Sequence, residues 1–185
     1  MRPLPAAALC LLLAAAGPQV PISDLVLAPG VFAELPATAP VRFHHTRTGA
    51  KTPVDETLHL SRRPEGGLVI AGDTPIAEFG LGSANPIVLY FLEGVVREMA
   101  QETGGSPFYI RNRMREALSR TAIAGAVTEV QPFDKDPNRG QMGDWGGLTL
   151  EFTADRAVPG GVQALQAQLD APEGYREAMV LVKGD

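Results

Sequence analysis

The spacing of hydrophobic and polar residues predicts a β-meander in the first half of the chain. From residue 41 to 48 the pattern alternates, and it places Val41, Phe43 and His45 on one face of a strand. The segment 57–63 alternates in the same way. The turn residues Pro64-Glu65-Gly66-Gly67 then lead into a short strand over 68–71, with 48–56 as the longer connection.

The period changes to that of a helix after residue 85. Asn85 is a favourable N-cap, Pro86 suits the first helical position, and the spacing predicts a helix over 86–103 with Leu92 on its apolar side. Gly104-Gly105 ends this helix, and Ser106-Pro107 begins a second one over 107–119, with Leu118 inward. Glu93 and Arg97 have the i,i+4 spacing of an ion pair.

The last third of the chain returns to strand patterns, over 122–131, 148–153 and 175–183, with a polar loop over 134–145. Residues 162–169 fit either a helix or a strand, and the flanking turns favour a strand. The order predicts an α+β fold: a mostly antiparallel sheet (meander) with an inserted pair of short α-helices packed on it.

The N-terminal sixteen residues have the pattern of a cleaved secretory signal peptide. Arg2 precedes an apolar run too short to span a membrane, and Ala14-Ala15-Ala16 supplies small residues for cleavage. We therefore predict a signal peptide over 1–16, a short tether over 17–24 and a single domain over 25–185. We expect a periplasmic (or secreted) protein of a Gram-negative bacterium, with no transmembrane span after cleavage.

Charge and cysteine content narrow the function classes. The formal charge is −5, or −6 once Arg2 leaves with the leader, which argues against nucleic acid or an anionic membrane as partner. Cys10 is the only cysteine and lies in the leader, so the mature chain lacks a disulfide, a thiol nucleophile and a thiolate metal site. A lipoprotein would lipidate Cys10, but Leu9 precedes it where a small residue is needed.

Two of the three histidines are weak candidates for a metal site. If the first two strands pair, His44 and His59 project from the same face as diagonal neighbours, and Asp73 could complete a zinc site. The alternative is that both are polar residues on the outward face of a strand pair. His45, on the opposite face, is predicted to be a hydrogen-bonded core residue.

A second weak metal candidate is the loop that begins at residue 134. Asp134, Asp136 and Asn138 place oxygen atoms at positions 1, 3 and 5 of a calcium loop. However, Arg139 stands where the turn glycine belongs, and Trp145 stands where the bidentate glutamate belongs. The conformational interpretation, an Asp-rich turn, is therefore favoured.

The second helix offers a candidate site for an anionic ligand. Arg111 and Arg115 share a face and could bind a carboxylate or phosphate, with Gly105 and Ser106 at the adjoining helix start. The alternative is a solvated helix face. Ser106 lacks the context of a catalytic serine, and N-capping accounts for it.

The leading functional hypothesis is an exported, non-catalytic binding or accessory protein of the cell envelope, without a cofactor. Its partner would be another envelope protein or a small anionic or apolar ligand. One alternative is a metal-dependent or hydrolytic periplasmic enzyme that uses His44 and His59. The order of elements is also similar to that of small periplasmic carriers with a curved sheet and a helical lid, which implies a lipid or apolar-ligand carrier as another alternative.

Overall fold

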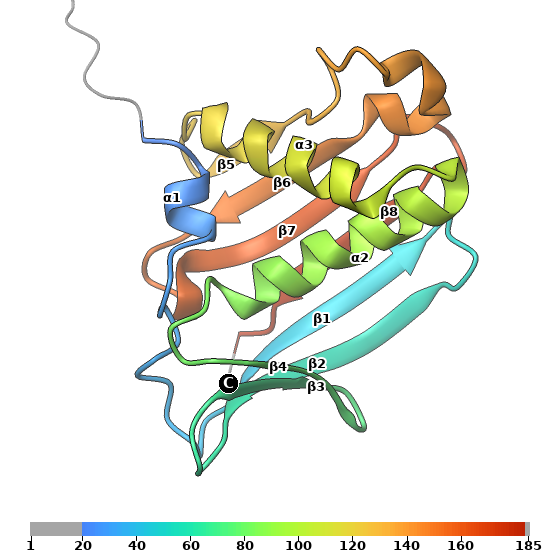
Figure 1. The fold of residues 1–185 in the computed structure, drawn as a ribbon. Coiled ribbons are helices and arrows are strands. Elements are labelled where there is room, and N and C mark those ends of the chain that lie inside the picture. Colours follow the sequence, from blue (N-terminus) through green and yellow to red (C-terminus); the bar gives the residue numbers. More distant parts are fainter. Residues whose placement is uncertain (1–19, 184–185) are drawn as a thin grey trace, which may run out of the picture.

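An eight-stranded antiparallel sheet forms the frame of the protein (Figure 1). The computed structural model describes residues 20–183, so the expected leader, residues 1–16, lies outside the described residues. The strand order is β4-β3-β2-β1-β8-β7-β6-β5. The strands are β1 (Val41–Thr48), β2 (Val54–Arg62), β3 (Leu68–Ala71), β4 (Pro75–Phe79), β5 (Val127–Val130), β6 (Thr149–Ala154), β7 (Val162–Gln168) and β8 (Arg176–Leu181).

The first and the last strand pair at the centre of this sheet. Phe43 of β1 lies opposite Leu181 of β8, and the register continues to Thr48 opposite Arg176. The two flanking halves of the sequence therefore build one sheet, and the predicted α+β fold with a helical pair inserted between β4 and β5 is confirmed.

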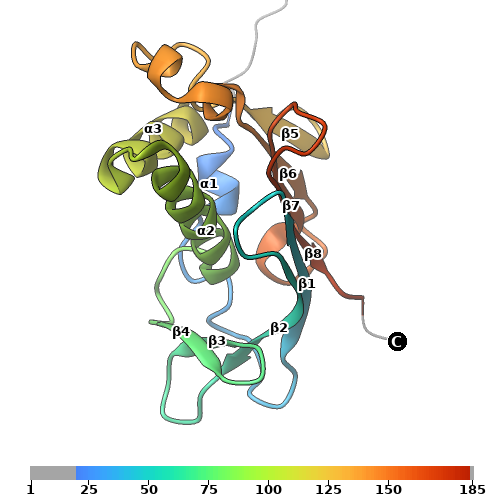
Figure 2. The same cartoon turned by 90° about the vertical axis from the view of Figure 1, so that its right-hand side faces the viewer.

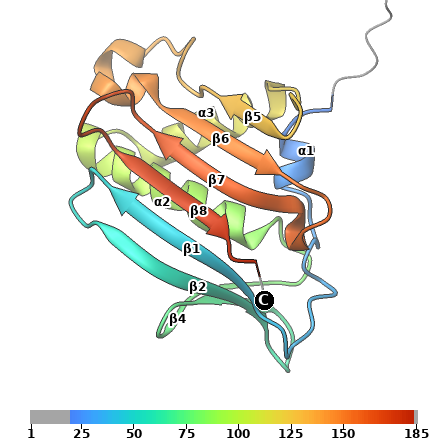
Figure 3. The same cartoon turned by 180° about the vertical axis from the view of Figure 1, so that it is seen from behind.

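The two predicted helices are also confirmed, as α2 (Pro86–Thr103) and α3 (Pro107–Arg120). The Asn85 side chain accepts hydrogen bonds from the backbone N–H groups of Ile87 at 3.1 Å and Val88 at 3.4 Å, as an N-cap does. Both helices and the short α1 (Ser23–Val26) lie on one face of the sheet (Figure 2). The opposite face carries no helix from the described part of the chain (Figure 3).

The hydrophobic core fills the space between α2 and the sheet. Phe91, Val95 and Met99 of α2 are buried, as are the inward residues of the strands, among them Phe43, Leu58, Leu60, Phe152 and Leu165. Leu118 of α3 is buried, as expected. Leu92 is only partly buried, because the helical face that meets the sheet is centred on Phe91 instead.

Several boundaries differ from the sequence-based expectations. Residues 162–168 form β7, which settles the ambiguous segment as a strand. β2 begins at Val54, three residues earlier than expected, because Val54 pairs with Arg47 of β1. β4 was not predicted, since it is an edge strand whose five residues are exposed or only partly buried and show no clear alternation.

The end of the expected tether packs against the domain. Ile22 is fully buried, and its backbone N–H donates to the carbonyl of Thr121 at 2.8 Å. The short α1 follows directly. Between residues 20 and 183, no helix is both long and apolar enough to cross a membrane.

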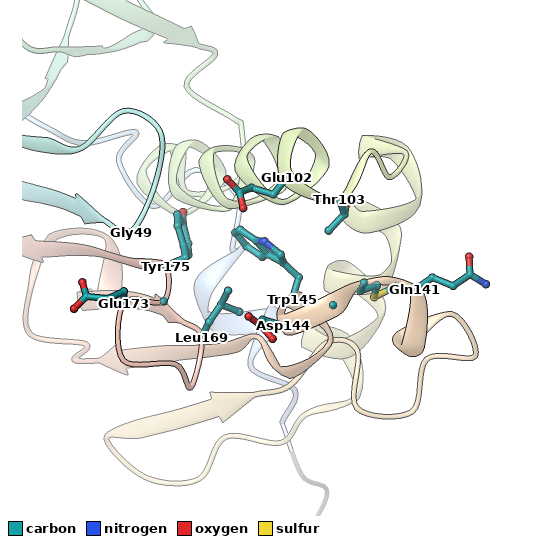
Figure 4. A pocket seen from close by; sticks show the side chains of 12 residues that line it. Gly49, Glu102, Thr103, Gln141, Asp144, Trp145, Leu169, Glu173 and Tyr175 are labelled. Atoms are coloured by element: carbon teal, nitrogen blue, oxygen red, sulfur yellow. The ribbon is translucent and has the colours of Figure 1, made fainter.

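The polar loop after β5 folds into two short 3-10 helices, η1 (Arg139–Gln141) and η2 (Gly143–Gly147), and a third, η3 (Pro159–Gly161), precedes β7. η2 brings Trp145 to the end of the sheet at which α2 terminates (Figure 4).

Candidate functional site

A buried ionic network lies on the face of β1 and β8 that α2 covers. His45 is 1% exposed, and its two ring nitrogens lie 3.0 Å from Oε1 of Glu56 and 2.8 Å from Oε1 of Glu177. Arg47 lies opposite Glu177 in the sheet register and donates to both of its carboxylate oxygens, at 2.9 and 3.2 Å. The Tyr175 hydroxyl also donates to Glu177. The prediction that His45 is a hydrogen-bonded core residue is confirmed.

Hydrogen bonds and ion pairs shift the pKa values of this network. Both ring nitrogens of His45 lie within hydrogen-bond distance of carboxylate oxygens. Burial would raise the pKa of Glu177, but hydrogen bonds from His45, Arg47 and Tyr175 outweigh it and lower that pKa. Burial and the charge of Glu177 raise the pKa of Tyr175, which keeps this phenol neutral.

α2 closes over the network because residue 94 lacks a side chain. A Cβ atom on Gly94 would lie 3.1 Å from Nη2 of Arg47 and 3.1 Å from Oε1 of Glu177. On the same helix, the buried Glu98 accepts a hydrogen bond from the backbone N–H of Lys51 at 3.4 Å. α2 thus covers the network closely, while the Glu56 side chain at its edge is 37% exposed.

An open cavity of about 450 Å³ lies beside this network at the end of the sheet (Figure 4). We call it the rim cavity. Five segments meet there: the end of α2, η1, η2, the β1–β2 connection and the β7–β8 turn. Its lining consists of Gly49, Glu102, Thr103, Gln141, Met142, Gly143, Asp144, Trp145, Leu169, Glu173, Gly174 and Tyr175.

The backbone at the cavity wall is held tightly where two turns meet. Gly49 has a φ of 65°, and a Cβ atom there would lie 2.4 Å from the carbonyl oxygen of Gly174. Only glycine allows both this left-handed conformation and this close approach. The β1–β2 connection and the β7–β8 turn therefore form a fixed wall.

The side chains of the rim cavity carry negative charge and no positive charge. Glu102, Asp144 and Glu173 are exposed, and the lining contains no lysine, arginine or histidine. None of the three carboxylates forms a hydrogen bond or ion pair with another side chain of residues 20–183.

The floor of the cavity is aromatic. The rings of Trp145 and Tyr175 lie 4.8 Å apart, tilted by 41°. Tyr175 connects the floor to the buried network, since its hydroxyl binds Glu177. Trp145 is 5% exposed, yet its indole N–H has no hydrogen-bond acceptor within the described part of the chain and is not sealed from solvent. Figure 4 shows the indole ring among the side chains that surround the cavity.

The four residues proposed for an anion site form two pairs with different surroundings. Gly105 and Ser106 line a second cavity, of about 410 Å³, which shares Thr103, Gln141 and Met142 with the rim cavity. The Ser106 side chain accepts from the Tyr109 backbone N–H at 3.5 Å, as an N-cap.

Arg111 and Arg115 line neither of these cavities. Arg111 donates from Nε to Glu93 at 3.0 Å, so Glu93 pairs across the two helices and not with Arg97 as expected. Arg115 donates to Asn112 at 2.7 Å. Anion binding at these arginines stays a prediction.

The two histidines proposed as metal ligands lie on the outward face of β1 and β2. His44 lies 2.7 Å from Asp55, and the register places His59 diagonally from it on the outward face. Within residues 20–183, no group of three metal-ligating side chains comes together.

In the loop, the buried Asp136 is occupied by protein donors. It accepts from Arg113 at 2.6 Å, from the Tyr109 hydroxyl at 2.8 Å and from the Asn138 backbone N–H at 2.8 Å. Burial would raise the pKa of Asp136, but these donors lower it. The Asp-rich loop therefore anchors α3 to the η1 region, while Asp134 and Asn138 make separate contacts with Arg139 and Tyr109.

Sequence reasoning did not identify the rim cavity. Its residues come from segments up to 126 positions apart, between Gly49 and Tyr175, and no motif links them. The one available signal was Trp145, the only tryptophan of the chain, placed in a polar loop. No family model matches the sequence, and no curated protein was found as a relative.

Proposed function

We propose that this protein is an exported, non-catalytic binding or accessory protein of the cell envelope, and that the rim cavity is its ligand site. The observation that carries the proposal is the contrast between two sets of polar groups. Those of the buried network bind one another beneath α2. Those of the rim cavity belong to Trp145 and to three acidic residues that form no hydrogen bond or ion pair with another described side chain, and these residues line a space that a small molecule can enter.

The cellular location in this proposal depends on the N-terminal sequence. The basic start, the short apolar run and Ala14-Ala15-Ala16 favour export across the inner membrane. Stability without a disulfide is supplied by the core between α2 and the sheet.

The interior of the fold favours the rim over a central apolar site. Phe91, Val95 and Met99 of α2 pack directly on the sheet, so an apolar ligand there would have to displace core side chains. A carrier would need that space open. The rim cavity requires no such displacement.

The fluorescence of Trp145 gives a direct test, because the chain has no other tryptophan. A library of small polar and apolar compounds is screened for a change in Trp145 emission and in melting temperature. A ligand at about 100 times its Kd should stabilise the protein by about 2.7 kcal/mol, which is a shift of roughly 5–10 °C for a domain of this size.

Matched variants locate the binding. Gln141 is exposed and lines the rim cavity, so Gln141→Phe should block it and abolish the response. Gln101→Phe places the same side chain at an exposed position of α2 outside the cavity and should leave the response intact. Ligands that bind Gln141→Phe as tightly as the wild type would reject the rim cavity as the site. A library without any ligand would reject a small-molecule binding function.

A further inference from the structure

We propose that the rim cavity selects a small polar ligand that carries an ammonium group together with hydrogen-bond acceptors, as an amino alcohol or an amino sugar does. This inference rests on the proposed function and names the class of ligand. It differs from the anionic or apolar ligand that the sequence suggested, because the cavity lies away from Arg111 and Arg115.

The charge of the lining favours a cationic ligand. Glu102 of α2, Asp144 of η2 and Glu173 of the β7–β8 turn all line this cavity, so three separate elements each contribute an acidic residue to it (Figure 4). No lysine, arginine or histidine of the lining compensates them. An anionic ligand would be repelled there, whereas an ammonium group would be attracted.

The cavity floor offers a hydrogen-bond donor without a partner, an observation that is independent of charge. Trp145 is nineteen-twentieths buried, and its N–H has no acceptor within the described residues while remaining accessible. Because this N–H is accessible and no side chain or carbonyl of the described residues accepts from it, an acceptor oxygen on a ligand can bind it. A simple alkylamine lacks such an oxygen, whereas an amino alcohol or amino sugar supplies one.

The hydroxyl groups next to Trp145 are already committed to protein acceptors. The Tyr175 hydroxyl donates to Glu177 and the Thr103 hydroxyl donates to the Met99 carbonyl at 2.7 Å, so neither is free to donate to a ligand. Trp145 is thus the side-chain donor of the floor, and the carboxylates at the rim accept. The site matches a ligand that donates through nitrogen and accepts through a hydroxyl or ring oxygen.

Three sugars with one ring but different charges test the inference. Glucosamine, glucose and glucuronate are titrated into the full protein, and binding is followed by Trp145 fluorescence and by calorimetry. Ethanolamine is a smaller member of the same class. We expect glucosamine to bind at least about tenfold more tightly than glucose, glucuronate not to bind, and the glucosamine affinity to fall with added salt because the carboxylates are exposed.

Two triple variants test whether the carboxylates of the rim cavity attract the ammonium group. Both variants remove three negative charges by the same types of substitution. Glu102→Gln, Asp144→Asn and Glu173→Gln together should weaken glucosamine about tenfold while glucose changes little. Glu34→Gln, Asp73→Asn and Glu129→Gln together remove three exposed carboxylates that do not line the cavity, and should have no effect.

The outcomes separate this inference from the proposed function. Equal binding of glucose and glucosamine, or a glucosamine affinity that survives the first triple variant, would overturn the ammonium selectivity and leave the binding function standing. The ammonium selectivity is also overturned if neither amine binds while other compounds perturb Trp145 in a Gln141-dependent manner. If no compound binds at the rim cavity, both proposals fall.

Discussion

The carboxylate of Glu177 joins side chains from two adjacent strands beneath α2, and its loss should be costly. In Glu177→Gln, the mostly buried Arg47 keeps its charge but loses the carboxylate that pairs with it, and His45 loses a hydrogen-bond partner. We expect the free energy of unfolding to fall by about 3–5 kcal/mol, measured by chemical denaturation. Glu93→Gln removes the same charge from the exposed pair with Arg111 and should cost at most about 1 kcal/mol. Equal costs would contradict a structural role for the network.

Two buried carboxylates should make the stability of the protein depend on pH. The pKa of Glu177 and that of Asp136 are lowered in the folded protein, so their contribution to stability is present at neutral pH. It is lost as the pH falls through these lowered values, below the ordinary carboxylate range near about pH 4. The free energy of unfolding should therefore decrease steeply there.

A variant isolates one of these two groups. Asp136→Asn should show a shallower acid dependence than the wild type, because the titrating group that Arg113 and Tyr109 hold has been removed. Asp73→Asn, at an exposed position, should keep the wild-type dependence. Unfolding curves at a series of pH values decide this, and identical acid limbs for Asp136→Asn and wild type would contradict it.

For single residues, the sequence predicted the role of a side chain better than its hydrogen-bond partners. The alternation over 41–48 placed His45 inward, and a buried histidine needs hydrogen bonds, so its role was predictable. Its partner Glu177 lies 132 positions away, and only the pairing of β1 with β8 brings them together. Trp145 entered the sequence analysis only as the residue that replaces the bidentate glutamate of a calcium loop, because no local pattern tells which segments surround it.

Among the elements, α2 depends on Gly94 to approach the sheet. Alanine in a helix interior is normally about 1 kcal/mol more favourable than glycine. Here the added Cβ would crowd Arg47 and Glu177 at 3.1 Å, so we expect Gly94→Ala to lower the free energy of unfolding by about 1–3 kcal/mol. Gln101→Ala, on the exposed side of the same helix, should be nearly neutral. A more stable Gly94→Ala protein would show that the helix is free to move away.

Leu118 of α3 and Leu92 of α2 differ in how deeply they are buried. Leu118→Ala should cost about 2–5 kcal/mol, since Leu118 is 1% exposed. Leu92→Ala should cost less, because Leu92 is only partly buried and can lose its contacts without leaving a closed cavity. Denaturation of both variants under one set of conditions checks the order, and the reverse order would contradict the assigned core face.

The elements that could be predicted are those whose ends are marked by capping residues close to them in the sequence. Asn85-Pro86 and Ser106-Pro107 cap their helices within a few residues, so both helices were expected at nearly the observed bounds. The edge strand β4 has no such signal, and its exposed side chains remove the alternation that marks a half-buried strand. On the predicted apolar face of α2, only Leu92 differs: it is partly buried while its neighbour Phe91 is fully buried, because both residues are apolar and only packing distinguishes them.

For the whole molecule, the N-terminal segment matters both for export and for the stability of the fold. Ile22 is fully buried and bonded to Thr121, and Pro21 bridges Ala122. A leader removed near Ala16 would leave these contacts in the mature protein, whereas cleavage beyond Ile22 would remove a core side chain. The exported protein therefore keeps these contacts only if the signal peptide is cleaved before residue 21.

The position of this cleavage can be measured directly. When the full chain is expressed in a Gram-negative host, we expect it in the periplasmic fraction, with a mass that corresponds to a start near Gly17. Mass spectrometry of the purified protein measures this. A matched chain in which Leu11, Leu12 and Leu13 are changed to Asp should stay uncleaved, because a charged segment cannot act as the apolar core of a signal. An intact Met1 in the unchanged protein, or a lipid on Cys10, would contradict the secretory assignment, while the fold built on Ile22 and α2 would be unaffected.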